Sequence, residues 1–111
     1  MDTTFRQDIV DVLDALLLEM PGVKRGKIFG FPGYKVGGKV FTAVGGNALG
    51  VKLPAKRVAD LIASGDPAMH PFEVGEGTVW KEWLSIQRDD AAGYRGDVAL
   101  FEESAQYVGG G

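Results

Sequence analysis

Apolar residues near the N-terminus recur every three or four positions, as in a helix with one buried side. Over residues 3–20 this stripe consists of Phe5, Ile9, Val12, Leu13, Leu16, Leu17 and Met20. Thr3 or Thr4 can act as the N-cap, and Pro21-Gly22 ends the pattern. The sequence therefore predicts an amphipathic helix over residues 3–20.

From Val23 onward the chain reads as short segments separated by glycines, which is typical of antiparallel strands. Strands are predicted over residues 24–29, 34–36, 39–44 and 49–53. Gly37-Gly38 predicts a two-residue hairpin loop, because a primed turn needs a positive φ at both central positions. This loop pairs Val36 with Lys39, and a regular ladder would then bring Tyr34 opposite Phe41.

The second half of the chain predicts two more helices and one more strand. A helix starts at Pro54, and residues 68–78 form a loop or a short strand. The segment "TVWKEWLSI", Thr78 to Ile86, predicts a final strand with Trp80 and Trp83 on opposite sides. Apolar residues on both of its sides favour a central or well-covered position. Residues 89–108 predict a closing helix, and 109–111 a disordered glycine tail.

These elements predict an α+β fold in which an antiparallel sheet of about five strands packs against an N-terminal, a middle and a C-terminal helix. The 111 residues suit one domain, 1–111. The absence of cysteine excludes disulfides and thiolate metal sites. No apolar run approaches the roughly 20 residues that cross a bilayer, and the N-terminus lacks the positive start of a signal peptide. We therefore expect a cytoplasmic protein without membrane contact.

The charge distribution along the chain is uneven, although the net charge is only −3. Residues 20–59 contain eight lysines and arginines and no acid. Residues 1–19 carry one base against five acids, and residues 60–111 carry three bases against ten acids. This asymmetry predicts either an anionic partner for the middle segment or neutralisation by the flanks. The candidate residues for binding nucleic acid or another partner are Lys24, Arg25, Lys27, Tyr34, Lys35 and Lys39.

Candidate catalytic chemistry is sparse. His70 is the only histidine, and the sequence gives it no partner or orienting group. The pairs Asp89-Asp90 and Glu102-Glu103 suit capping and solvation better than paired-carboxylate catalysis. We therefore predict no catalytic residue, no metal site and no cofactor. Gly30 and Gly33 either bend the chain between two strands or let a ligand approach the backbone.

Several short motifs together resemble the N-terminal domain of the TfoX/Sxy family. They are Phe29-Gly30, Gly38-Lys39-Val40-Phe41, Val51-Lys52-Leu53-Pro54, Pro71-Phe72 and Lys81-Glu82-Trp83, in this order over about residues 5–108. The YjbR-like family, which shares the hairpin, is the second resemblance. Both imply a compact α+β domain. Full-length TfoX/Sxy proteins regulate natural competence and carry a second, helical domain, for which this chain has no room.

Three functions stay open from the sequence. The leading hypothesis is a non-enzymatic regulatory or protein-interaction module that binds a protein partner or self-associates. The alternative is nucleic-acid binding by the basic 24–57 region, and its signature would be an affinity that falls steeply with salt. The second alternative is a small-ligand pocket near Gly30–Gly33.

Overall fold

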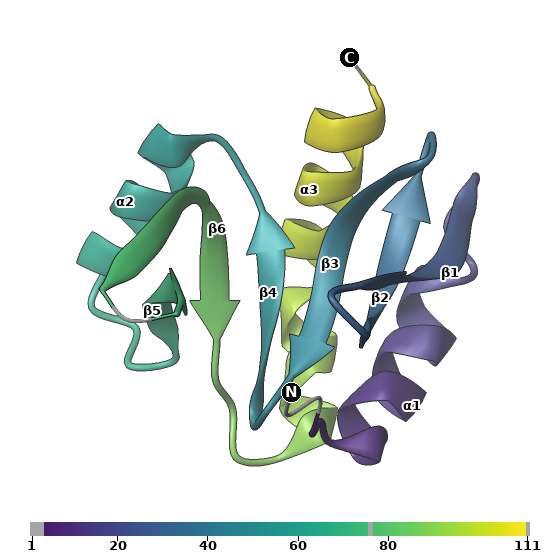
Figure 1. Ribbon diagram of the computed structural model, residues 1–111, viewed down its shortest axis with the longest axis horizontal. Coiled ribbons are helices and arrows are strands. Elements are labelled where there is room, and N and C mark those ends of the chain that lie inside the picture. Colours follow the sequence, from purple (N-terminus) through teal and green to yellow (C-terminus); the bar gives the residue numbers. More distant parts are fainter. Residues whose placement is uncertain (1–3, 76, 111) are drawn as a thin grey trace.

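The computed structural model describes residues 4–75 and 77–110, and these form the predicted α+β fold (Figure 1). The helices are α1 (Gln7–Leu17), α2 (Ala55–Ala63) and α3 (Val98–Gly109), with a 3₁₀ helix, η1 (Ala91–Asp97), leading into α3. The strands are β1 (Val23–Ile28), β2 (Phe31–Val36), β3 (Lys39–Gly45), β4 (Ala48–Lys52), β5 (Met69–Val74) and β6 (Thr78–Ile86).

The six strands make one antiparallel sheet in the order β1-β2-β3-β4-β6-β5. The expectation of about five strands is short by one, because residues 69–74 pair with β6 as a strand. Pro71 weakened the strand signal there, and proline is tolerated because β5 lies at the edge of the sheet. β6 has the predicted central position, between β4 and β5.

The hairpin between β2 and β3 agrees with the prediction at its loop but not in the strand pairing further from the loop. Gly37 and Gly38 both have positive φ, at 61° and 80°, and Val36 pairs with Lys39. A bulge between Tyr34 and Lys35 then shifts the register, so that Tyr34 lies opposite Thr42 rather than opposite Phe41. The expected Tyr34–Phe41 pair is therefore wrong.

The two faces of the sheet have different coverings. All three helices pack on one face, and Figure 1 shows α3 behind β3 and β4. The strand residues of this helix-covered face that belong to the main core are Val23, Tyr34, Phe41, Val44, Leu49, Val51, Met69, Leu84 and Ile86. We call the other side the open face; the register places Ala43, Gly45, Ala48, Gly50, His70 and Ser85 on it.

The helix ends differ from the predicted limits for local reasons. α1 begins at Gln7 rather than near residue 3, because Arg6 is extended and Phe5 forms a bridge with Gly46. Thr4 is thus not the N-cap, and Thr3 lies outside the described residues. The predicted closing helix is divided in two: the 3₁₀ helix η1 comes first and α3 follows. The glycines of this segment lie in η1, and they favour the tighter 3₁₀ turns there. Gly109 ends α3 and Gly110 is its C-cap, so the expected tail starts too early.

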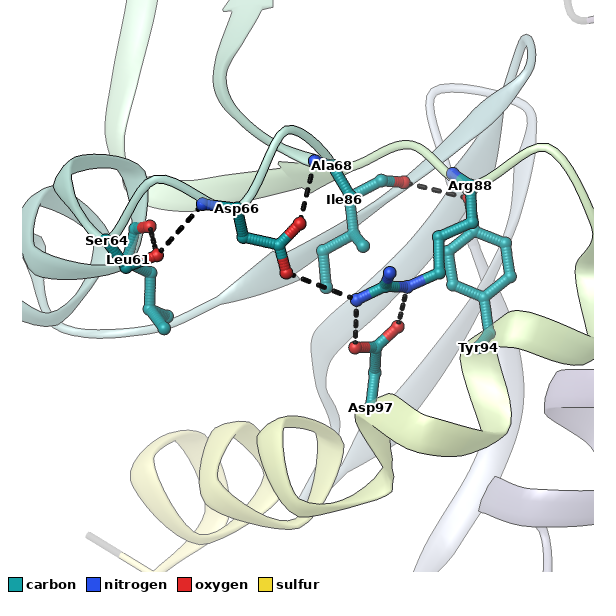
Figure 2. Close-up of polar contacts among 8 residues, drawn as sticks. All are labelled: Leu61, Ser64, Asp66, Ala68, Ile86, Arg88, Tyr94 and Asp97. Carbon is teal, nitrogen blue, oxygen red and sulfur yellow. Dashed lines mark hydrogen bonds and ion pairs between the residues drawn. The ribbon is translucent and has the colours of Figure 1, made fainter.

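A polar network fixes the chain after β6 (Figure 2). Arg88 forms two hydrogen bonds of 2.7 Å to Asp97, which is 5% exposed, and lies 3.6 Å from the carboxylate of Asp66. The Tyr94 hydroxyl donates to the Ile86 carbonyl and accepts from the Arg88 amide. The segment after α2 and the start of α3 are thereby held to the end of β6.

Candidate ligand-binding site

The predicted basic surface is divided in the structure. Tyr34, expected among the binding residues, is fully buried, and its hydroxyl donates to Asp14 at 2.7 Å, with the Val10 carbonyl oxygen 3.3 Å away. Burial and the bond to Asp14 raise the pKa of Tyr34 above its usual value. Arg25 lies 3.3 Å from the same Asp14 carboxylate. Tyr34 is therefore a core residue that anchors α1, and Arg25 is paired with that helix.

The lysines of this segment do not share one face. Lys24 lies beside Lys35 on the open face, while Lys27 lies beside Pro32 on the other side of the edge strand β1. Lys39 is exposed at the β2–β3 turn. Two further cations of the basic middle segment pair with acids: Lys56 with Asp60, and Arg57 with Glu103 on α3. Partial neutralisation by the acidic flank accounts for these pairs.

The two candidate glycines lie beside hollows of different size. Gly30 has a φ of 84° in the β1–β2 turn and borders a shallow hollow with Phe5, Lys27 and Pro32. Gly33 is buried within β2, where an added Cβ would meet the Thr42 carbonyl oxygen at 3.2 Å. Neither lines the larger hollow described next.

The larger hollow is a cavity of about 660 Å³ on the open face of the sheet. Its floor is made of four small residues on the neighbouring strands β3 and β4: Ala43, Gly45, Ala48 and Gly50. A Cβ at Gly50 would clash with the Phe72 ring, and one at Gly45 would lie 3.3 Å from the Phe31 ring. The small floor residues thus leave the space in which aromatic rings approach the sheet.

Aromatic side chains form the walls of this cavity. The Phe72, Trp80 and Trp83 rings contact one another with centroids 5.5–6.4 Å apart. The expectation that Trp80 and Trp83 point to opposite sides is wrong, because both line the cavity. The β5–β6 register shifts between Pro71 and Glu73, so that a short stretch of β5 lies opposite a longer stretch of β6. The β6 side chains there do not alternate regularly between the two faces.

Phe29 joins the first hairpin to the last across the open face. Its ring centroid lies 6.0 Å from that of Trp80. Phe29 is 67% exposed and has a φ of 52°, the only positive φ among the described residues other than glycine. A phenylalanine in this region is strained by roughly 1–2 kcal/mol. Backbone strain retained at the rim of a cavity is typical of functional positions.

Polar side chains line the cavity beside the aromatic rings, further along β5 and β6. His70 and Ser85 are paired across β5 and β6 on the open face. Gln87 donates from Nε2 to Ser85 Oγ at 3.4 Å, and its backbone N–H donates to the Ala68 carbonyl. The cavity therefore has an aromatic part and a hydrogen-bonding part.

The sequence contained one signal for this site that was not used. Small residues alternate on β3 and β4, at 43 and 45 and at 48 and 50, and alternation places each pair on one face. A strip of small residues through the middle of a sheet predicts a hollow or a close approach by another group. The residues that cover this strip, Phe72 and Trp80, come from distant segments, and only the fold brings them there.

Comparisons of the chain with known protein families, with curated proteins and with solved structures find no match. The resemblance to the TfoX/Sxy family thus stays a prediction from its motifs. Residues 4–75 and 77–110 contain no helix long and apolar enough to span a membrane. The same residues contain no group of three or more histidines and acids placed to hold a metal ion. The site is defined by its geometry as an aromatic-walled cavity on the open face of an α+β domain.

Proposed function

We propose that this protein is a small-ligand-binding module that holds a flat, mainly apolar molecule in the open-face cavity. The observation that carries this proposal is the cavity itself, about 660 Å³ with an aromatic wall and a floor of small residues. Ligand sites of this size are typically concave, mostly apolar and supplied with a few polar groups. Filling a hollow walled by Phe72, Trp80 and Trp83 is favourable, because burial of apolar surface stabilises a complex.

The lining residues favour a protein that binds its ligand over one that catalyses a reaction of it. Serine and histidine act together when a hydrogen bond lets the histidine accept the hydroxyl proton. In the described part of the chain no such bond joins Ser85 to His70, and Ser85 Oγ instead accepts from Gln87. We therefore propose a non-enzymatic module, and the family resemblance suggests a regulatory use of the bound state.

Nucleic-acid binding by the basic segment is the less favoured alternative. It needs several unpaired cations and stacking rings on one surface. Arg25 is paired with Asp14 and Tyr34 is buried, whereas Lys24 and Lys27 lie on opposite sides of β1. A steep fall of affinity with salt would still identify it.

The proposal is tested with N-phenyl-1-naphthylamine, an uncharged apolar probe whose emission rises in apolar surroundings. Trp80 and Trp83 are the only tryptophans in the protein, and both line the cavity. Their fluorescence therefore reports binding at this site. We expect saturable probe emission together with quenching of the tryptophans. Ala43→Leu, which fills the floor, should weaken probe binding about tenfold or more, because the cavity loses the space for a ring.

Ala99→Leu is the matched control, since it adds the same side chain at an exposed position of α3. It should leave probe affinity unchanged. Gly45→Ala is a milder second variant that brings a methyl group against the Phe31 ring. Equal probe binding by wild type and by a folded Ala43→Leu protein would contradict the proposed site, as would no probe binding by the wild type.

A further inference from the structure

We infer that the cavity selects an uncharged planar heteroaromatic ring whose polar edge is hydrogen-bonded by His70, Ser85 and Gln87. This inference rests on the proposed function and specifies its ligand class. It comes from the division of the cavity into two parts. The ring body lies against Phe72, Trp80 and Trp83, and the polar edge of the ring lies in the part where His70 pairs with Ser85.

The polar part has hydrogen-bonding capacity to offer. A serine hydroxyl has one donor and two acceptor sites, and a glutamine side chain has two donors and one acceptor oxygen with two lone pairs. Ser85 and Gln87 use one site each on their shared 3.4 Å contact. No other side-chain hydrogen bond joins Ser85, Gln87 or His70 to the rest of residues 4–75 and 77–110. The three side chains can therefore donate to and accept from a ligand edge.

The charge of the lining favours an uncharged ligand. Among residues 4–75 and 77–110, no lysine or arginine lines the cavity, and the one acidic lining residue is Glu73 on the edge strand β5. Ser85 is buried in the polar part of the lining, where an ion without a partner would be poorly solvated. Aromatic walls add offset or edge-to-face contacts that suit a flat ring. The complement of this lining is an aromatic ring with neutral donors and acceptors.

The test uses four probes of nearly equal shape: naphthalene, quinoline, 4-quinazolinone and 2-naphthoate. Binding to the full chain is measured by calorimetry and by tryptophan quenching, with all four probes at the same pH. We expect 4-quinazolinone to bind about fivefold or more tighter than naphthalene, since each net hydrogen bond contributes a severalfold gain. We expect 2-naphthoate to bind more weakly than naphthalene.

Ser85→Ala and Gln87→Leu then identify the polar part. Each should remove most of the preference for 4-quinazolinone, measured as the ratio of its affinity to that of naphthalene in the same variant. General destabilisation would lower both affinities and leave this ratio unchanged. Tight naphthalene binding with no preference for the polar ring, or with a preference for 2-naphthoate, would overturn the inference and leave the proposed function standing. Failure of every probe to bind would overturn both.

Discussion

The two faces of the sheet use the same six strands for different purposes. On the helix-covered face, side chains such as Val44, Leu49 and Ile86 are almost fully buried against the three helices. On the open face, β3 and β4 carry Ala43 and Gly50, and the half-buried rings of Phe72 and Trp80 line the same cavity. Along β3 and β4, alternation places a large residue on one side and a small residue on the other.

This difference separates stability from binding. Burial of apolar area is the main favourable term in folding, and most of it lies on the helix-covered face. The open face gives up part of that burial, since glycine and alanine leave a cavity where larger residues would fill the space. Substitutions on the two faces should therefore change different measurements.

The largest expected effect contrasts two phenylalanines on opposite sides of the sheet. Phe101 on α3 is fully buried in the main core, whereas Phe72 is half-buried on the open face. Phe101→Ala should lower the free energy of unfolding by about 4 kcal/mol, because it leaves an enclosed void. Phe72→Ala should cost about 1–2 kcal/mol, since solvent can enter the space it leaves. Urea denaturation measures both.

Probe binding should rank the two variants in the opposite order from stability. Phe72→Ala should weaken N-phenyl-1-naphthylamine binding, while the folded fraction of Phe101→Ala should bind it like the wild type. Similar losses of stability in both variants would mean that the open face belongs to the core. The separation of a stabilising helix-covered face from a binding open face would then be incorrect.

A second prediction concerns the polar network that supports the helix-covered side (Figure 2). Arg88→Met removes the guanidinium from Asp97, a nearly buried carboxylate that accepts two hydrogen bonds of 2.7 Å. We expect a loss of about 3 kcal/mol in unfolding free energy, because a buried charge is left without its partner. The double variant Arg88→Met/Asp97→Leu should regain part of this loss. No recovery in the double variant would show that Arg88 acts through other contacts.

The sequence predicted the helix-covered face better than the open face, for a physical reason. The stripe of α1 and the strands around Gly37-Gly38 depend on local periodicity and turn geometry, which are visible in a single chain. The bulge at Tyr34 shifts the β2–β3 register by one residue, and the local sequence pattern gives no sign of it. Residues 69–74 were ambiguous because Pro71 is acceptable only at a sheet edge, and the edge is set by the whole topology.

The candidate site was harder to predict, because it is built from pairings between distant segments. The positive charge of residues 20–59 is plain in the sequence, but the structure pairs Arg25 and Arg57 with acids on helices. Trp80 and Trp83 face one cavity only because the β5–β6 register shifts. Phe29 was visible as a phenylalanine beside a glycine, yet its position over Trp80 depends on how the two hairpins approach each other.

The smallest expected effect on stability has the opposite sign and tests the strained rim of the cavity. Phe29 and Gly30 both have positive φ, at 52° and 84°, between the paired residues Ile28 and Phe31. Asparagine suits this position far better than phenylalanine, as in the common Asn-Gly hairpin turn. Phe29→Asn should relieve about 1 kcal/mol of strain and lose about 0.5 kcal/mol from the ring contact with Trp80. We expect a net gain of about 0.5 kcal/mol in unfolding free energy.

The same substitution should weaken ligand binding, because the ring that bridges the two hairpins is removed. We expect N-phenyl-1-naphthylamine to dissociate severalfold faster from Phe29→Asn, measured by stopped-flow fluorescence. Gly37→Asn creates an equivalent Asn-Gly turn in the β2–β3 hairpin, away from the cavity, and should leave the dissociation rate unchanged. A more stable protein with weaker binding would mean that the strain at Phe29 is retained for function. Unchanged dissociation would instead make Phe29 a surface residue that only happens to contact Trp80.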